Sequence, residues 1–438
     1  MKRSYFKQLL LIAILFIVTT SSQAQYLWNS DSAFKAGAAN SGRLWGYVFG
    51  DFYYKGHADS LNRGGNNQYT GIPKSRNAFQ FRRLYLGYDF NITNKFSAEL
   101  LLAAEDNFPI ENPPSATSAV SGDQLLNNKE SFFIKYADVQ WKNIWKGTTL
   151  VVGEQATPAF PFITERLWNY RSIERTISDI RRTPSYDMGV GLRGLFDPAK
   201  GNFGYNLLVA NGNSAKPAAN GFKWFYGDVY AYAFNKKLVF DVYADYYRLN
   251  WQPGWHHDRQ MWKGYIAYTT PALTIGVEGY VNTIKNDTKA TLIAGGADTI
   301  NTAAKGISFY VHGDIVKSYL RFFARVDTYN PNSNVDNGKY NAYAGISSPN
   351  GYNSVGYKLT YSPSTGAPTA VASTVNDPTS KELFITAGLD FTPAKNVHFM
   401  PNIWYNHYAT QLTGAAKTAE PDNYDLVYRM TFYFVFGK

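Results

Sequence analysis

The chain has 438 residues, no cysteine, 17% aromatic residues and a formal net charge of +10. The absence of cysteine excludes disulfides, thiol catalysis and cysteine-based metal sites. Beyond the first two dozen residues, no apolar run approaches the ~20 residues that a membrane helix needs. The mean hydropathy of −0.32 does not argue against a membrane β-barrel, because only every second residue of such a barrel faces lipid.

The first 24 residues predict a secretory signal peptide. Lys2, Arg3 and Lys7 precede an apolar stretch at 9–18, and the SQA triplet at 22–24 is a small-x-small cleavage site. We expect residues 25–41 to form a periplasmic N-terminal segment and residues 42–438 to form one barrel domain. Cleavage would remove three cations and no acid, lowering the charge from +10 to +7. That charge favours anions in a pore, or attraction to acidic lipopolysaccharide.

From residue 42 onward, apolar and polar residues alternate in about sixteen runs of roughly ten residues. Short connections such as 91–94 and 235–237 alternate along the chain with long polar ones such as 106–130 and 330–380. Tight turns at one end and long loops at the other are typical of outer-membrane barrels. The sequence therefore predicts an all-β, closed antiparallel transmembrane β-barrel of about 16 strands with both termini in the periplasm. A further hairpin within 340–361 would make eighteen.

Each run has one apolar and one polar face. Leu84, Leu86 and Tyr88, for example, share a face opposite Arg83 and Asp89. Because a charge facing lipid at mid-depth costs ~2–4 kcal/mol, the polar faces are expected to line a wet lumen. The predicted pore-lining residues are Arg83, Asp89, Glu99, Arg193, Asp241, Asp245, Arg321, Arg325, Asp327 and Arg429.

Lys135 does not fit this pattern. Alternation places it on the lipid face of its run, beside Phe133, Ala137 and Val139. Either it lies near the membrane interface and snorkels, or the register of this strand slips.

Several segments resemble porins of the phosphate-selective O/P type, and more specifically the porin-like proteins of Bacteroidota. They include FRRLYLGYDF at 81–90, VGEQATP at 152–158, YRSIERTI at 170–177, RVDTYNP at 325–331 and AGLDF at 387–391. The resemblance implies a sixteen-stranded, trimeric outer-membrane channel whose third long loop folds into the lumen. It does not establish phosphate as the solute, because many acids are mixed among the arginines of the predicted lumen.

The third long loop contains a segment, 169–182, that breaks the strand period. At ~100° per residue, Tyr170, Ile173, Ile177 and Ile180 share one helical face. We expect a short helix that packs these residues on the barrel wall and presents arginines to the pore, since guanidinium groups stay charged and match oxyanions. The predicted constriction comprises Arg171, Arg175, Arg181, Arg182, Glu174 and Asp179. The alternative is an amphipathic surface helix whose two acids neutralise the arginines.

Catalytic motifs are weak. The GVGLRG run at 189–194 matches a dinucleotide fingerprint but lies inside an alternating strand and lacks the required strand–turn–helix context. His256 and His257 are adjacent, so in a strand they point to opposite faces. We therefore predict no catalytic residue, no metal site and no cofactor, and we expect that the protein is not an enzyme.

The sequence predicts an outer-membrane porin of a Gram-negative bacterium for passive, mildly anion-selective diffusion of small hydrophilic solutes. We expect contact with outer-membrane lipid and lipopolysaccharide, assembly into a homotrimer and no binding to nucleic acid. One alternative is a sugar or oligosaccharide facilitator with an aromatic track. Another is a non-conducting assembly or secretion partner that docks through 330–380. The aromatic track of the sugar facilitator would consist of Tyr85, Tyr243, Tyr247, Tyr265, Tyr280 and Tyr310.

Overall fold

The computed structural model of the chain describes residues 39–61, 63, 67–70, 72–105, 131–180, 183–218, 221–252, 255–345, 379–419 and 421–437. The expected signal peptide at 1–24 and nearly all of the expected segment 25–41 lie outside the described residues, as do Arg181 and Arg182.

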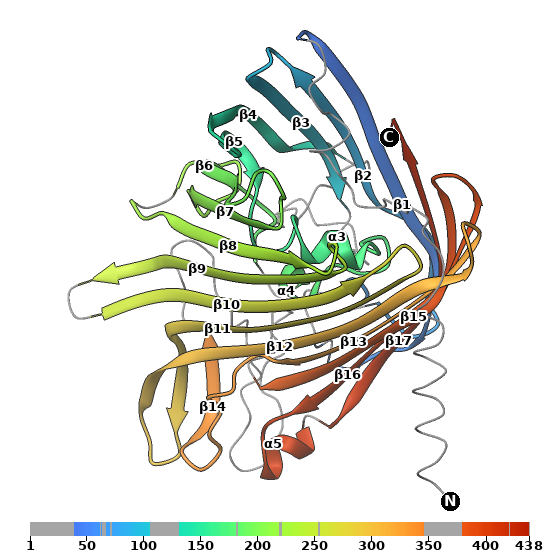
Figure 1. Cartoon of the computed structure of the whole chain (residues 1–438). Coiled ribbons are helices and arrows are strands. Elements are labelled where there is room, and N and C mark those ends of the chain that lie inside the picture. The colour runs from blue at the N-terminus through green and yellow to red at the C-terminus, as the bar shows by residue number, and fades with distance from the viewer. Residues whose placement is uncertain are drawn as a thin grey trace, which may run out of the picture.

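The described strands form one antiparallel sheet, and sixteen of them close into a barrel (Figure 1). Closure is made by β1, which pairs with β2 on one side and with β17 on the other. The predicted fold class is therefore confirmed. The barrel strands are β1 (Ser41–His57), β2 (Asn77–Asn91), β3 (Phe96–Glu105), β4 (Phe133–Trp145), β5 (Thr148–Ala156), β6 (Tyr186–Leu195), β7 (Phe203–Ala210), β8 (Trp224–Ala233), β9 (Leu238–Gln252), β10 (Trp255–Thr269), β11 (Leu273–Leu292), β12 (Ala297–Val316), β13 (Leu320–Asn330), β15 (Ser380–Ala394), β16 (Val397–Thr410) and β17 (Asn423–Phe436).

One further strand, β14 (Tyr340–Gly345), lies outside the barrel wall. It pairs with residues 288–292 near the far end of β11, whereas β13 pairs directly with β15. A short helix, α5 (Gly414–Ala419), follows β16 at the same end of the molecule (Figure 1). The rest of the segment in which we considered a further hairpin, 346–361, lies outside the described residues.

Every second connection, starting with 92–95 between β2 and β3, is a short turn, and these turns lie at one end of the barrel, here called the turn end. The opposite end, the loop end, carries the long connections and two short ones, 253–254 between β9 and β10 and 293–296 between β11 and β12, so the expected alternation of short and long connections fails there. The turn at Asn143–Gly147 shows how the turn end is built: Asn143 and Gly147 both have positive φ, at 53° and 82°, and the Gly147 amide donates to the Asn143 side chain over 3.2 Å. The barrel also begins and ends at the turn end, because the Asn40 amide bonds to the Asn91 carbonyl and Gly46 pairs with Phe436.

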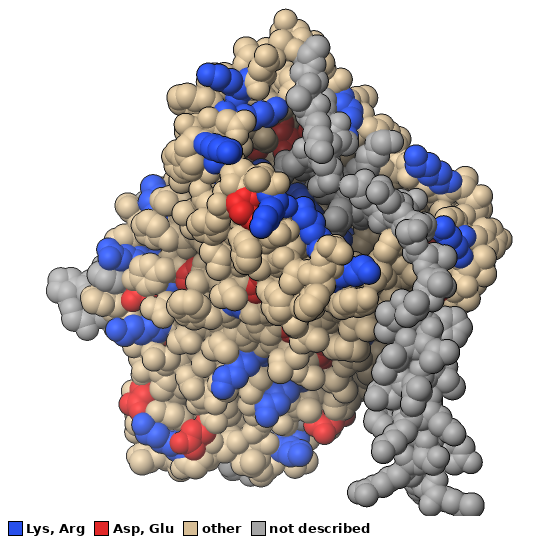
Figure 2. Space-filling model, in the orientation of Figure 1, with Lys and Arg blue, Asp and Glu red and all other residues tan. Residues whose placement is uncertain are grey.

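The outer faces of the strands are apolar and exposed. Val139, Val190, Val229 and Val242 are each about half exposed, and uncharged side chains cover most of the face in Figure 2. A continuous apolar exterior of this extent is unsuited to water. No helix in the described part of the chain is long and apolar enough to cross a membrane.

Lys135 faces inward. The pairing of β3 with β4 shifts between Leu101 and Leu102, so both Lys135 and Tyr136 are buried in the lumen while Ile134 and Ala137 are exposed outside. The placement on the lipid face is therefore wrong, and the slip of register is the correct alternative. The physical reason is a β-bulge, which inserts one residue and inverts the alternation beyond it.

Candidate functional site: a lumen narrowed by the third loop

The connection between β5 and β6, residues 157–185, folds into the barrel and is here called the third loop (Figure 1). It forms two short helices, α3 (Thr164–Trp168) and α4 (Ile177–Ile180), instead of one helix over 169–182. Asn169 ends α3 with a left-handed φ of 57°, and its amide bonds back to the Glu165 carbonyl. The predicted short helix therefore forms only at 177–180, whereas α3 precedes the predicted segment.

The apolar residues of this loop pack against one side of the barrel interior. Ile173 and Ile177 are fully buried, and Tyr170 and Ile180 are nearly so. Ile173 belongs to a cluster with Tyr265 and Tyr310, while Ile177 belongs to a cluster with Tyr243 and Tyr280. At ~25 cal/mol per Å² of apolar surface, burial of these side chains stabilises the inward position of the loop by several kcal/mol.

Wall arginines bind the carbonyl oxygens of the third loop. Arg82 donates to the Ser172 carbonyl at 2.7 Å, Arg429 to the Ile173 carbonyl at 3.1 Å and Arg325 to the Arg175 carbonyl at 2.5 Å. An irregular loop leaves carbonyls without helical or sheet partners, and buried carbonyls need donors. These three arginines, all at most 4% exposed, are here called the arginine clamp.

Two wall aromatic rings complete this attachment. The Trp404 indole donates to the Glu174 carboxylate at 2.9 Å, and His312 contacts the Leu167 carbonyl at 2.9 Å. Burial opposes ionisation of Glu174, but Arg175, Arg82 and the Trp404 hydrogen bond outweigh it, so that the pKa of Glu174 lies below its ordinary value. Glu174 is therefore an ionised anchor between the loop and β16.

The arginines predicted to form the constriction are paired with acids. Arg171 forms ion pairs with Glu165 and with Asp179, the latter at 2.9 Å. Arg175 lies 3.8 Å from both Glu174 and Asp179. Burial raises the pKa of Glu165 despite the neighbouring Arg171. The described part of the loop has three arginines, at 166, 171 and 175, and three acids, at 165, 174 and 179, so its formal charges cancel.

The predicted pore-lining residues differ in their surroundings. Arg325 and Arg429 belong to the arginine clamp, and Asp327 is ion-paired with Arg325. Asp241 and Asp245 are buried in the wall, paired at 3.0 Å with Lys263 and Arg259. Arg83 shares Glu105 with Lys135 in a buried network, and Arg321 pairs with Asp314 at 2.8 Å near the turn end. The residues that line an open cavity are Asp89, Glu99 and Arg193.

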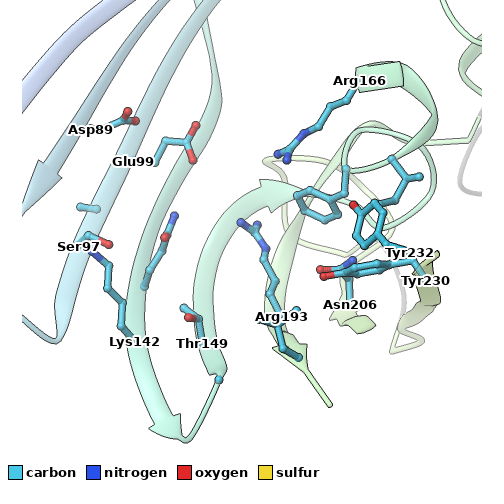
Figure 3. Close-up of a pocket in the computed structure, with 17 residues that line it drawn as sticks. Asp89, Ser97, Glu99, Lys142, Thr149, Arg166, Arg193, Asn206, Tyr230 and Tyr232 are labelled. Carbon is cyan, nitrogen blue, oxygen red and sulfur yellow. The ribbon is translucent and has the colours of Figure 1, made fainter. Parts of the chain in front are cut away.

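This cavity has a volume of about 370 Å³ and lies between the third loop and the inner face of β2–β8 (Figure 3). Asp89 and Glu99 project from β2 and β3 on one side. Arg166 from α3 and Arg193 from β6 project from the other, and Figure 3 shows their guanidinium groups directed into the same space. Asp89 is paired with Arg43 at 2.6 Å. Arg166 was not among the predicted site residues, because its position depends on how α3 is oriented inside the barrel.

The six tyrosines considered as a sugar track are all packed. Each is at most 5% exposed, and the Tyr265 and Tyr310 hydroxyls bond to each other. Ring faces that are covered by the third loop or by neighbouring rings cannot stack on a passing sugar.

A second loop, which the sequence pattern did not predict to enter the lumen, also folds inward. Between β1 and β2, Tyr69 is fully buried and donates to Asp51 at 2.8 Å, while Asn67 donates to Glu382 at 2.9 Å. The clamp residue Arg429 donates to the Tyr69 hydroxyl at 3.3 Å as well as to the third loop. Short-range periodicity carries no signal for such contacts between distant segments.

No cluster of three or more metal-ligating side chains occurs among the described residues. His257, one of the two adjacent histidines in the sequence, pairs with Asp287 at 3.0 Å, and both side chains are fully buried.

Comparison with known proteins identifies the fold. No protein-family model and no curated protein matches the chain. Among solved structures, the anion-selective porin of Comamonas acidovorans is 11% identical, with a TM-score of 0.51, and the alignment covers 91% of this chain and all of that one. The outer-membrane channel DcaP of Acinetobacter baumannii is 10% identical, with a TM-score of 0.52 and coverage of 92% and 99%. Salmonella typhi OmpF is 10% identical, with a TM-score of 0.50 and coverage of 91% and 98%. The chain thus has the barrel fold of outer-membrane porins.

Proposed function

We propose that this protein is an outer-membrane porin through which small hydrophilic solutes diffuse passively. The observation that carries the proposal is the third loop, which wall arginines and packed isoleucines fix across the lumen while a charged cavity stays open beside it. A barrel of sixteen strands is wide enough for an aqueous channel, and an inward loop sets its narrowest point. The apolar exterior supports insertion in a membrane, with the turn end toward the periplasm.

Mild anion selectivity is part of this proposal. It is supported by Arg166 and Arg193, which face the cavity and form no ion pair with a carboxylate of the described residues. One structural neighbour is itself described as anion-selective. Arg171 and Arg175 contribute less to this selectivity than their sequence pattern predicts, because Glu165, Glu174 and Asp179 balance their charges. Phosphate, aromatic acids and other small anions all remain within this class of solute.

Planar-bilayer recording of the purified, folded protein tests the proposal. We expect stepwise conductance and a reversal potential on the anion side in a salt gradient. Replacing Arg171 and Arg175 by Ser should shift that potential only slightly toward cations. A folded barrel that inserts but carries no current would refute the porin function and favour a role as an assembly or secretion partner. A potential on the cation side would refute the selectivity alone.

A further inference from the structure

The cavity beside the third loop combines unneutralised guanidinium groups with apolar surface. Arg193 makes one long hydrogen bond, 3.4 Å to Gln155, and its guanidinium lies 4.6 Å from the Phe162 ring centre. The Arg166 guanidinium lies 5.7 Å from the same ring. Phe162 thus holds two cations near each other without cancelling their charge.

Apolar and aromatic side chains continue along the same side of the cavity. Ile163 and Leu195 flank Phe162 and the two arginines, and Tyr230 and Tyr232 border the space beyond. Figure 3 shows the two tyrosines on the side of Arg193, away from Asp89 and Glu99. A solute drawn to the guanidinium groups therefore meets ring and aliphatic surface at the same time, whereas a compact, fully hydrated anion gains nothing from that surface.

We propose that Arg166, Arg193 and the surrounding apolar side chains form a binding subsite for small carboxylates that carry an aromatic or apolar body. This inference rests on the proposed function, because the subsite lies on the route of permeation. The carboxylate accepts charge-assisted hydrogen bonds from Arg166 and Arg193. Its body covers the surface formed by Ile163, Leu195 and the tyrosines, which raises the occupancy of the cavity relative to small inorganic anions.

The first test is block of the potassium chloride current by benzoate, acetate or inorganic phosphate, each added separately in planar bilayers. We expect benzoate to reach half-block at a concentration about tenfold below that of acetate or phosphate. The double variant R166Q/R193Q should raise the half-blocking benzoate concentration by about tenfold. K95Q removes a cation from an exposed turn-end position and should leave the block unchanged. Equal block by all three anions, or full benzoate block in the double variant, would overturn the subsite.

The second test separates failure of the subsite from failure of the porin function. Benzoate binding to the folded barrel in detergent is measured by calorimetry, which requires no conduction. Binding that is lost in R166Q/R193Q and kept in K95Q supports the subsite even if the barrel carries no current. No benzoate binding to the wild-type barrel, together with normal conductance, overturns the subsite and leaves the porin function standing.

Discussion

Removal of Arg429 is expected to loosen the third loop without disrupting the barrel. In Arg429→Met the apolar stem is kept, but the hydrogen bonds to the Ile173 carbonyl, the Tyr69 hydroxyl and the Asn402 side chain are lost. Among the described residues, Arg429 forms no ion pair with a carboxylate, so its replacement leaves no ion-paired acid without its partner. That makes it a cleaner perturbation than replacement of Arg82 or Arg325, whose partners Asp51 and Asp327 are buried.

The size of the effect follows from the buried Ile173 carbonyl, which accepts a hydrogen bond from Arg429. Leaving such an acceptor unsatisfied costs ~1–3 kcal/mol. Because 1.4 kcal/mol corresponds to a factor of ten, a loop position displaced from the wall should become roughly 5- to 150-fold more populated. The remaining donors, Arg82, Arg325 and Trp404, keep the inward position the major one.

Single-channel recording measures this effect. The variant should show frequent transitions to a larger conductance, which are rare in the wild type, while its folded form still resists unfolding in detergent. Lys95→Gln is the control, because Lys95 is an exposed cation in the turn between β2 and β3, at the turn end of the barrel. A current in Arg429→Met with wild-type amplitude and noise would refute the idea that the clamp holds the loop.

Three further outcomes are expected. Lowering the pH should increase anion selectivity, because protonation of Glu165 removes a negative charge from the third loop. The pKa of Glu165 is raised by burial, so this change should occur at a pH above the ordinary glutamate range. A titration of the reversal potential measures the change, which should be absent in Glu165→Gln. Gly153→Val should prevent or greatly slow barrel assembly, since φ is +133° and a Cβ would lie 2.2 Å from the Ala137 carbonyl oxygen; a normal folded yield would contradict this. Lys135→Met should destabilise the folded barrel by ~1–3 kcal/mol in urea titrations, because Glu105 loses one of the two cations with which it forms ion pairs among the described residues, Arg83 and Lys135. An unchanged midpoint would exclude an ionic role for Lys135.

The strand architecture was predictable because its signal is local. Alternation with a period of two identified the outward side of β9, where Val242 is exposed, and the inward side, where Asp241 and Tyr243 are buried. The same rule failed at Lys135, where one inserted residue inverts the faces. Nothing in the sequence around residue 135 marks that bulge.

The site was less predictable because it depends on contacts between distant segments. Alternation predicted that the side chains of Arg325 and Arg429 point into the lumen, but it could not show that the third loop would cover them. Burial of Ile173 and Ile177 followed from their apolar character, whereas the helix they were assigned to did not form over its full predicted length. Of the two partners of Arg171, Asp179 belongs to the alternative prediction, in which acids of the segment 169–182 neutralise its arginines, whereas Glu165 lies before that segment and was not predicted.

The attachment of the third loop also sets an order of events during folding. Its wall contacts come from far along the chain: Trp404 is 230 residues from Glu174, and Arg429 is 256 residues from Ile173. Contacts at such separations form late, after the entropy of closing long stretches of chain has been overcome. The narrow passage is therefore complete only when β17 has paired with both β16 and β1, and an intermediate that lacks these pairings is an open sheet whose third loop is without its attachments to Trp404 and Arg429.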